Sequence, residues 1–318
     1  MPDEWNVNSY MDWLRLEAKL ADFWSALPPS ARLLSRWSRS RRFPELTYVR
    51  EELVGSYKAR KYLSLLPWLY ERGYRKVRVR GSSHSTNVAQ LGLLLREHGM
   101  EPVYQMEGRG GPPAGNVLLT NLIYGRGFKK RDGEADFEIP EGGSCEAALA
   151  GSLGLVGSLV ECALGARRWV DDIYIDSGTG FTAAALLLGL GFFRLPCRVL
   201  VVSMTGQNRS DIESLVETYR TEMERILSVA VSLPKFEVHP PPAGPSFGSV
   251  PSASLAEVAD FAQREGILVD PIYAAKLGLF YRENRNAERE ALMFVSGGAR
   301  ELLCFQGPLR KWLENQGS

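Results

Sequence analysis

Strand and helix patterns alternate along most of this chain, and this alternation restricts the fold more than any other feature. Short apolar or alternating segments that predict strands occur at 47–49, 76–80, 102–105, 137–139, 173–176, 198–204 and 288–295. Segments with helical spacing occur at 8–26, 60–73, 87–98, 116–124, 146–164, 183–191, 211–230 and 255–265. Strands that alternate with helices predict parallel sheets covered by helices on both faces.

Size, charge and hydropathy restrict the class of protein. The 318 residues suffice for two modest domains, and the 45% apolar and 24% charged residues are ordinary for a globular protein. The net charge of +1 predicts neither a nucleic-acid partner nor a membrane partner. No window approaches the roughly 18 consecutive apolar residues of a membrane helix, and no signal peptide is evident, so we expect a soluble, cytoplasmic protein.

The remaining compositional signals favour structural roles. The basic run Arg36–Arg42 predicts a solvated surface stretch, with an anionic partner as the alternative. The four cysteines form no CxxC pair, which predicts reduced and mostly buried thiols. The three histidines have no metal-ligand spacing, so we expect no catalytic metal.

The segment Ile173–Gly191 (IYIDSGTGFTAAALLLGLG) predicts a strand, a glycine-rich loop and a helix in succession. Gly178 and Gly180 allow backbone N–H groups to approach an anion closely, and Thr179 and Thr182 add hydroxyl donors. The positive end of the helix dipole adds to this attraction. The loop is therefore a candidate phosphate site, with a purely structural turn as the equal alternative.

Two further segments combine reactive or polar groups with a predicted helix start. In GSYKARK, Lys58 follows a glycine turn, and burial in an apolar cleft would lower its pKa and make the amine nucleophilic. In GSSHSTNVAQ, Ser85 and Thr86 precede a helix whose free N–H groups suit a carboxylate. The alternatives are a surface lysine in the first case and helix capping in the second.

Taken in chain order, these segments resemble the fold-type II pyridoxal-phosphate enzymes, which include cysteine synthase and the tryptophan synthase β-subunit. In particular they resemble the D-cysteine desulfhydrase and 1-aminocyclopropane-1-carboxylate deaminase family. The resemblance spans roughly residues 47–305 and rests on six segments: KARK at 58–61, residues 115–126, PEGGS at 140–144, GPSFGSVP at 244–251, EGILVDPIYAAK at 265–276 and SGG at 296–298.

The resemblance implies a fold, a cofactor and an assembly. We expect an α/β protein with two open, mostly parallel twisted sheets and helices on both faces. A large cofactor-binding domain would comprise residues 1–55 and 165–318, and a small substrate-loop domain residues 56–164. The cofactor would be pyridoxal 5′-phosphate, the partner a small amino-acid substrate, and the assembly a homodimer.

The resemblance also implies residue roles. Lys58 would carry the cofactor as a Schiff base and transfer protons, and Ser85 and Tyr273 would complete the catalytic set. Asn87 would bind the ring hydroxyl, and Ser296 would meet the pyridine nitrogen. The cofactor phosphate would be held by Ser177, Gly178, Thr179, Gly180 and Thr182. The substrate would be bound by Ser85, Thr86, Asn87 and Tyr273.

Several positions depart from the family pattern. Met293 stands where the deaminase has a second tyrosine, Phe247 replaces the tyrosine of the 244–251 loop, and Ser56-Tyr57 replaces the Gly-Asn before the lysine. The substrate loop at His84–Asn87 is also altered. Loss of the second tyrosine argues against opening of a cyclopropane ring.

These features favour a lyase that acts by β-elimination on a small amino acid. Because the products include ammonia, the terms deaminase and hydrolase are also expected to apply. D-Cysteine would give pyruvate, ammonia and sulfide, and a neutral Ser296 hydroxyl at the ring would favour expulsion of a β-leaving group. The alternatives are a β-replacement synthase of the cysteine synthase type, 1-aminocyclopropane-1-carboxylate deaminase, and a non-catalytic cofactor-binding homologue. The altered loop and an N-terminal helix with Trp5, Trp13 and Trp24 keep the last alternative open.

Overall fold

Two sheets organise the residues that the computed structural model describes, which are 10–82, 85–106, 115–125, 134–244 and 246–316. The larger sheet has the order β1 (Trp37–Arg39), β2 (Leu46–Arg50), β9 (Ala291–Val295), β6 (Asp172–Ser177), β7 (Arg198–Ser203) and β8 (Lys235–His239). All neighbours in it are parallel except β1 and β2. The smaller, parallel sheet has the order β4 (Glu101–Met106), β3 (Lys76–Gly81) and β5 (Phe137–Ile139).

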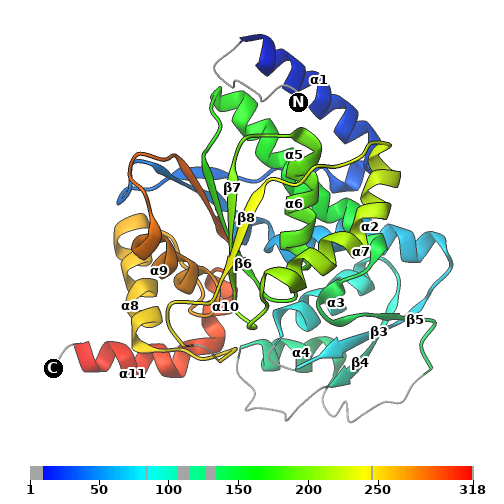
Figure 1. Ribbon diagram of the computed structural model, residues 1–318. Coiled ribbons are helices and arrows are strands. Elements are labelled where there is room, and N and C mark those ends of the chain that lie inside the picture. The colour runs from blue at the N-terminus through cyan, green and yellow to red at the C-terminus, as the bar shows by residue number, and fades with distance from the viewer. Residues whose placement is uncertain (1–9, 83–84, 107–114, 126–133, 245, 317–318) are drawn as a thin grey trace.

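Helices cover both faces of the larger sheet (Figure 1). One face packs on α5 (Leu149–Ala166), α6 (Phe181–Phe193) and α7 (Arg209–Leu227), and the other on α8 (Ser252–Asp260) and α9 (Ala274–Asn284). Successive strand residues point to opposite faces, so Ile173 and Ile175 join the first cluster while Tyr174 joins the second. The predicted fold class is confirmed.

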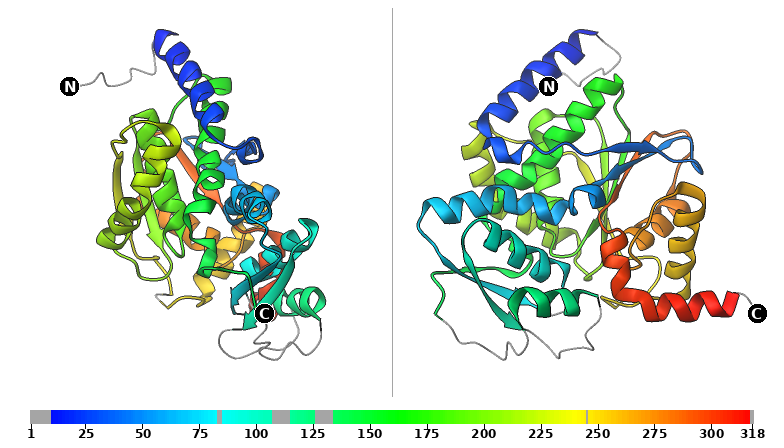
Figure 2. Two further views of the ribbon diagram at one scale, coloured as in Figure 1. Left: turned by 90° about the vertical axis from the view of Figure 1, so that its right-hand side faces the viewer. Right: turned by 180° about the vertical axis from the view of Figure 1, so that it is seen from behind.

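The remaining helices connect the two sheets and flank them (Figure 2). Helix α1 (Tyr10–Ala26) packs on α5, and α2 (Tyr57–Glu71) packs on both α5 and α3 (Thr86–Glu97). Helix α4 (Asn116–Tyr124) packs on α3, and the chain ends in α10 (Ala299–Leu302) and α11 (Gln306–Gln316). Strands of the larger sheet come from 37–50 and 172–295, and those of the smaller sheet from 76–139. The exact domain bounds stay a prediction.

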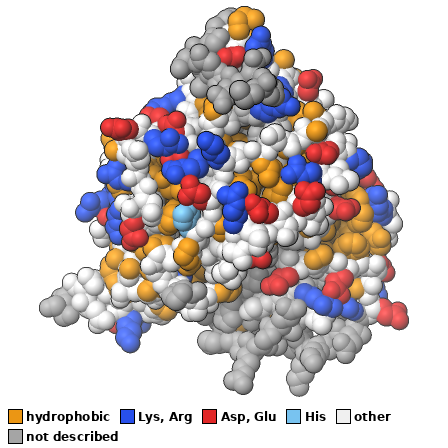
Figure 3. All heavy atoms as spheres, in the orientation of Figure 1, with side chains coloured by type: hydrophobic (Ala, Val, Ile, Leu, Met, Phe, Trp, Pro, Cys, Tyr) orange, Lys and Arg blue, Asp and Glu red, His pale blue; other side chains and the backbone are white. Residues whose placement is uncertain are grey.

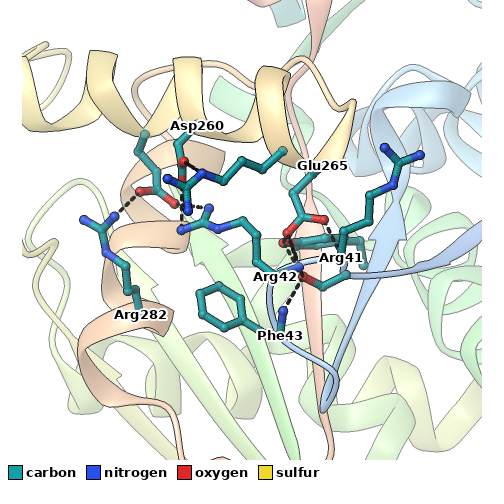
Figure 4. Close-up of polar contacts among 10 residues, drawn as sticks. Arg41, Arg42, Phe43, Asp260, Glu265 and Arg282 are labelled. Carbon is teal, nitrogen blue, oxygen red and sulfur yellow. Dashed lines mark hydrogen bonds and ion pairs between the residues drawn. The ribbon is translucent and has the colours of Figure 1, made fainter.

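The basic run Arg36–Arg42 is in part the predicted solvated stretch, because Arg36, Arg39 and Arg41 are exposed, but Arg42 is not. Its first half forms edge strand β1, and the Arg42 side chain is only 9% exposed. Arg42 pairs with Glu257 at 3.1 Å and with Asp260 at 2.7 Å, and its backbone N–H donates to Glu265 (Figure 4). Carboxylates from a distant part of the chain, which the sequence alone did not show as partners, therefore neutralise Arg42.

The helical segment Glu146–Ala166 corrects the expectation that no window approaches a membrane span. By length and composition it is long and apolar enough to cross a membrane, but 72% of its most apolar window is buried inside the protein. A Cβ added at Gly154 would lie 2.1 Å from the carbonyl oxygen of Ala31. The close packing predicted for this glycine-rich helix is therefore confirmed, and central burial accounts for its apolar composition.

The remaining expectations from composition concern the surface charge, the cysteines and the N-terminal tryptophans. On the face shown in Figure 3, basic and acidic side chains are interspersed and neither sign dominates. The thiols of Cys145, Cys162, Cys197 and Cys304 are free, but each cysteine is half-buried rather than buried as predicted. Of the N-terminal tryptophans, Trp13 is 6% exposed and Trp24 donates to Glu161 at 3.2 Å, while Trp5 lies outside the described residues.

Candidate active site

The order of the strands places the candidate site at the carboxyl ends of β6 and β9. From β6 the chain continues to β7 and β8 on one side, whereas β9 lies on the other side. In open parallel sheets, ligands bind outside the carboxyl ends of the strands at such a reversal. Ser177 ends β6 and Ser296 follows β9, so two of the predicted site residues meet here.

Lys58 enters this region from the first turn of α2. The helix begins three residues earlier than the sequence pattern predicted, because the Ser56 hydroxyl accepts a hydrogen bond from the Lys58 backbone N–H at 3.2 Å. The Lys58 ammonium lies 4.9 Å from the centre of the Tyr273 ring. Asp270 fixes Tyr273 by accepting its backbone N–H at 2.7 Å. Lys58 and Tyr273, which are 215 positions apart in the chain, therefore lie in one site.

The pKa of Lys58 moves in the direction opposite to the prediction. Burial acts to lower it, but Tyr273, Asp176, Asp270 and Glu301 outweigh burial and raise the pKa above its ordinary value. Burial also raises the pKa of Tyr273, so this hydroxyl is uncharged near neutral pH. In the cofactor-free protein, the nearby carboxyl groups therefore favour the protonated form of Lys58.

The predicted phosphate loop has the geometry of an anion site. Gly180 adopts a left-handed conformation (φ 81°) and begins the fully buried helix α6. Thr205 donates to the carbonyl of Gly178 at 2.7 Å, and Gln207 donates to that of Thr179 at 3.2 Å. With these carbonyls held, the N–H groups at the start of α6 remain available to an anion. Ser177 and Thr182 are buried beside this turn.

Gly178 and Gly180 differ in what a side chain would meet. A Cβ at Gly178 would lie 3.4 Å from the Tyr273 hydroxyl, an ordinary contact. A Cβ at Gly180 would lie 2.4 Å from Leu215 and would also strain the backbone. A bulky residue at Gly180 therefore damages the fold itself, and only Gly178 allows phosphate binding to be tested separately.

Lys61 is a second lysine at the phosphate loop, for which the sequence analysis gave no role. Its ammonium donates to the carbonyl of Gly142 at 2.7 Å and lies 4.8 Å from the ring centre of Phe181, the first residue of α6. Burial, and then the charge of Lys58, lower the pKa of Lys61 to about 7. No carboxylate among the described residues forms an ion pair with it. A buried cation without a counter-ion suits a phosphate.

The neighbouring Arg60 has a different role. It is fully buried and pairs with the equally buried Glu51 at 2.6 Å. It also donates to the carbonyl of Leu33 at 2.7 Å and to Ser35 at 2.9 Å. These contacts anchor α2 to the N-terminal segment and the turn before Lys58, so Arg60 is structural.

The Lys61 assignment predicts a pH-dependent loss of affinity. In Lys61→Met, affinity for 4′-deoxypyridoxine 5′-phosphate, which cannot bond to Lys58, should fall roughly 10-fold at about pH 6. Because the folded pKa of Lys61 is about 7, its charge is lost as pH rises through 7. The difference between wild type and Lys61→Met should therefore shrink toward pH 9, as measured by calorimetric titration. The exposed Lys76→Met is the control, and equal affinities at low pH would contradict the assignment.

The substrate-loop residues follow β3. Asn87 is buried, and its side-chain oxygen accepts a hydrogen bond from Tyr62 on α2, which leaves its NH₂ group as a donor for a ligand. Thr86 accepts from Asn116 at 2.8 Å, and Ser85 precedes α3 without a capping side-chain bond. The structure thus ties Asn87 to the helix of Lys58, but no described contact joins Ser85 or Thr86 to Lys58. His84 lies outside the described residues.

The segments 244–251 and 265–276 meet at Tyr273. The ring centres of Phe247 and Tyr273 lie 6.3 Å apart. Lys276 donates to the carbonyl of Gly244 at 3.0 Å and to Ser249 at 3.2 Å, and thereby holds the loop against α9. Two sequence segments noted only for their likeness to a family are therefore in physical contact.

Ser296 does not stand alone at its end of the site. It is 6% exposed and, against the opposing effect of burial, acts to lower the pKa values of Asp176 and Tyr57. The Tyr57 hydroxyl also donates to the Asp176 carboxylate. The place of Ser296 at the pyridine nitrogen stays a prediction, but a carboxyl group lies at the same end of the site. The sequence analysis gave Asp176 no role, although an acidic residue near the end of a buried strand, just before the glycine loop, was a signal available in the sequence.

Met293 lies deep in β9 rather than on a loop. It is fully buried, and the register sets it between Tyr48 of β2 and Tyr174 of β6. It belongs to the apolar cluster under α8 and α9, against which Tyr273 also packs. No hydroxyl replaces the tyrosine that the resemblance placed at this position.

Comparisons with known proteins identify what shares this arrangement. No family model matches the chain. A solved structure described as an ACC deaminase homologue superposes with a TM-score of 0.79 and 21% identity, covering 92% of this chain and 99% of that one. A pyridoxal 5′-phosphate-dependent aspartate racemase superposes with a TM-score of 0.57 and 11% identity, covering 89% and 95%. The chain has the fold-type II architecture.

Sequence relatives extend the comparison to named activities. A "Putative 1-aminocyclopropane-1-carboxylate deaminase" of Thermotoga maritima is 28% identical over 272 residues, covering 78% of this chain and 85% of the relative. A protein of the same name from Pyrococcus horikoshii is 27% identical, covering 77% and 80%. A "Putative D-cysteine desulfhydrase 2, mitochondrial" of Oryza sativa subsp. japonica is 26% identical, covering 72% and 71%.

These findings confirm the recognised resemblance to the desulfhydrase and deaminase proteins. The term hydrolase was wrong, because such eliminations belong to the lyases. The homodimer, the cytoplasmic location and the individual site roles stay predictions.

Proposed function

We propose that this fold-type II protein is a carbon–sulfur lyase that releases pyruvate, ammonia and sulfide from D-cysteine. The predictions that the chain is an enzyme and that it uses pyridoxal 5′-phosphate are confirmed by its relatives and structural neighbours. The choice of D-cysteine rests on the position of Tyr273 beside Lys58 and on the apolar burial of Met293.

The residues present fit the cofactor. The unpaired buried charge of Lys61 and the N–H groups at the start of α6 suit its phosphate. Asn87 retains an NH₂ group for the ring hydroxyl, and Lys58 lies close enough to Tyr273 for both to share one ligand. Gly178 leaves room between the loop and Tyr273 that a larger side chain would fill.

Pyridoxal phosphate, when bound, stabilises the negative charge that develops on an amino acid's α-carbon as its proton leaves. Lys58 would hold the cofactor and, with its amine free, would take the α-proton. The Tyr273 hydroxyl, whose raised pKa keeps it protonated near neutral pH, would donate a proton to a departing sulfur. Ser85 and Thr86, with the N–H groups of α3, would orient the substrate carboxylate.

One observation carries the preference for β-elimination, namely the apolar burial of Met293. D-Cysteine has an α-proton and a β-leaving group, so one base and one acid suffice. 1-Aminocyclopropane-1-carboxylate has no α-proton, so ring opening needs a further acid–base group. The deaminase activity remains the second candidate because the Thermotoga and Pyrococcus relatives carry that name.

The substrate assay separates the candidates. We expect pyruvate from D-cysteine and from β-chloro-D-alanine, and no 2-oxobutyrate from 1-aminocyclopropane-1-carboxylate, in a coupled dehydrogenase assay. Efficient 2-oxobutyrate release would contradict the proposal and favour the deaminase. New β-substituted amino acids formed with added sulfide or thiols would indicate a synthase. No turnover by a cofactor-loaded protein would indicate the non-catalytic homologue.

The variant Met293→Tyr, which introduces a hydroxyl at this position, is the matched test of the role given to Met293. If apolar burial at this position excludes ring opening, the variant should lose D-cysteine activity and gain measurable 2-oxobutyrate release. A circular dichroism melt checks that the larger ring is tolerated in the core.

A further inference from the structure

A buried carboxyl group in the site has an oxygen with no hydrogen-bond partner. Asp176 is 1% exposed and lies one residue before the end of β6, just ahead of the phosphate loop. Its Oδ2 accepts the Tyr57 hydroxyl, while its Oδ1 has no partner of normal geometry among the described residues. Buried polar atoms are nearly always paired, so Oδ1 marks the place of a missing donor.

The charges around Asp176 show what kind of donor is missing. Burial raises the pKa of Asp176 to about 6, the negative charge of Asp270 adds to this, and the positive charge of Lys58 acts against it. When Lys58 is bonded to the cofactor, it is no longer a free ammonium ion. A buried carboxylate that loses its cation is strongly unfavourable unless another positive group replaces it.

The position of Asp176 indicates that the positive group that replaces Lys58 beside it belongs to the bound cofactor. Asp176 is the penultimate residue of β6, and Ser296 comes directly after β9, the neighbouring strand at the reversal of the sheet. The sequence resemblance assigned the pyridine nitrogen to Ser296. The Tyr57 hydroxyl donates to Asp176. We propose that Asp176, rather than Ser296, is the partner of the cofactor's ring nitrogen and keeps it protonated.

Two neighbouring groups give Asp176 its geometry. The Tyr57 hydroxyl fixes the carboxylate through Oδ2 and also donates to the Asp176 carbonyl at 3.0 Å. That leaves Oδ1 to accept a ring N–H, and Ser296 orients the pair. Tyr57 stands directly before Lys58, so the same turn positions the carboxylate and the lysine. A protonated ring draws electron density more strongly from the α-carbon, so it would stabilise a carbanion more than a neutral Ser296 hydroxyl could.

This role of Asp176 rests on the proposed cofactor, and the protonation of the ring nitrogen can be measured independently of catalysis. Protein loaded with ¹⁵N-labelled pyridoxal phosphate should show a protonated ring nitrogen by ¹⁵N NMR at about pH 8. Asp176→Asn should give a neutral ring nitrogen, whereas Ser296→Ala should keep it protonated. Affinity for 4′-deoxypyridoxine 5′-phosphate should fall roughly 10- to 100-fold in Asp176→Asn, and affinity for its analogue with carbon in place of the ring nitrogen should not.

A neutral ring nitrogen in the loaded wild type would overturn the inference without any variant, even if Asp176→Asn fails to fold. A nitrogen that stays protonated in Asp176→Asn but not in Ser296→Ala would return the role to Ser296 and would also overturn it. Failure of the protein to bind pyridoxal phosphate at all would instead refute the proposed function, which keeps the two failures distinct.

Discussion

Replacement of Lys58 by alanine is expected to lower kcat for D-cysteine on the order of 10³-fold or more, because it removes the proton-transferring amine and the covalent anchor of the cofactor. Lys58 is the lysine whose ammonium lies over Tyr273, beside the Gly178 turn. Steady-state kinetics with saturating cofactor would give the change in kcat separately from the change in KM.

Matched variants distinguish loss of the amine from loss of charge. Lys58→Arg keeps the cation near Asp176 and Asp270 but cannot take the same role, so it should be as inactive as Lys58→Ala. Lys76→Ala, on the exposed start of β3, should keep wild-type rates. Substantial turnover by Lys58→Ala, without added amine, would show that another group performs the proton transfer.

Replacement of Glu51 by alanine is expected to lower the free energy of unfolding by about 3–5 kcal/mol, because it leaves the Arg60 guanidinium buried without a counter-ion. Both side chains are 0% exposed, and the carboxylate also accepts the Ser35 hydroxyl at 2.6 Å. Chemical denaturation followed by circular dichroism measures the loss. It should exceed the loss for Glu71→Ala, an exposed residue at the end of α2, which is expected within about 0.5 kcal/mol of wild type.

The double variant isolates the ion pair. Glu51→Leu combined with Arg60→Met replaces both charges by apolar side chains, so it should cost less than the sum of the two single changes. Additive losses would show that Glu51 and Arg60 stabilise the fold through separate contacts. A loss below about 1 kcal/mol for Glu51→Ala would contradict the structural role given to the pair.

Much of the fold followed from local patterns in the sequence. The apolar strand 173–176 and the helix after its glycine turn are long enough and regular enough to be predicted within a few residues. Edge strand β1 was taken for a basic surface stretch and β8 was not predicted, because neither has a continuous apolar run. The burial of Arg42 depends on Glu257 and Asp260, which no local pattern connects to it.

The parts of the site that could be predicted are those where a reactive side chain or a glycine-rich turn stands in a recognisable sequence segment. Lys58, the Gly178–Gly180 turn and Tyr273 lie together as the resemblance implied. The direction of the Lys58 pKa shift was not predictable, because it depends on Asp176 and Asp270, which are brought close only by the folded sheet. Tyr57 was noted as a departure from the family, yet its hydrogen bond to Asp176 appears only in three dimensions.

The central claim is that Lys58 binds pyridoxal phosphate covalently. Reduction of the cofactor-loaded protein with borohydride, followed by proteolysis and mass spectrometry, tests it most directly. We expect a stable phosphopyridoxyl group on Lys58 and none on Lys61. Recovery of the group on another lysine, or no incorporation at all, would contradict it.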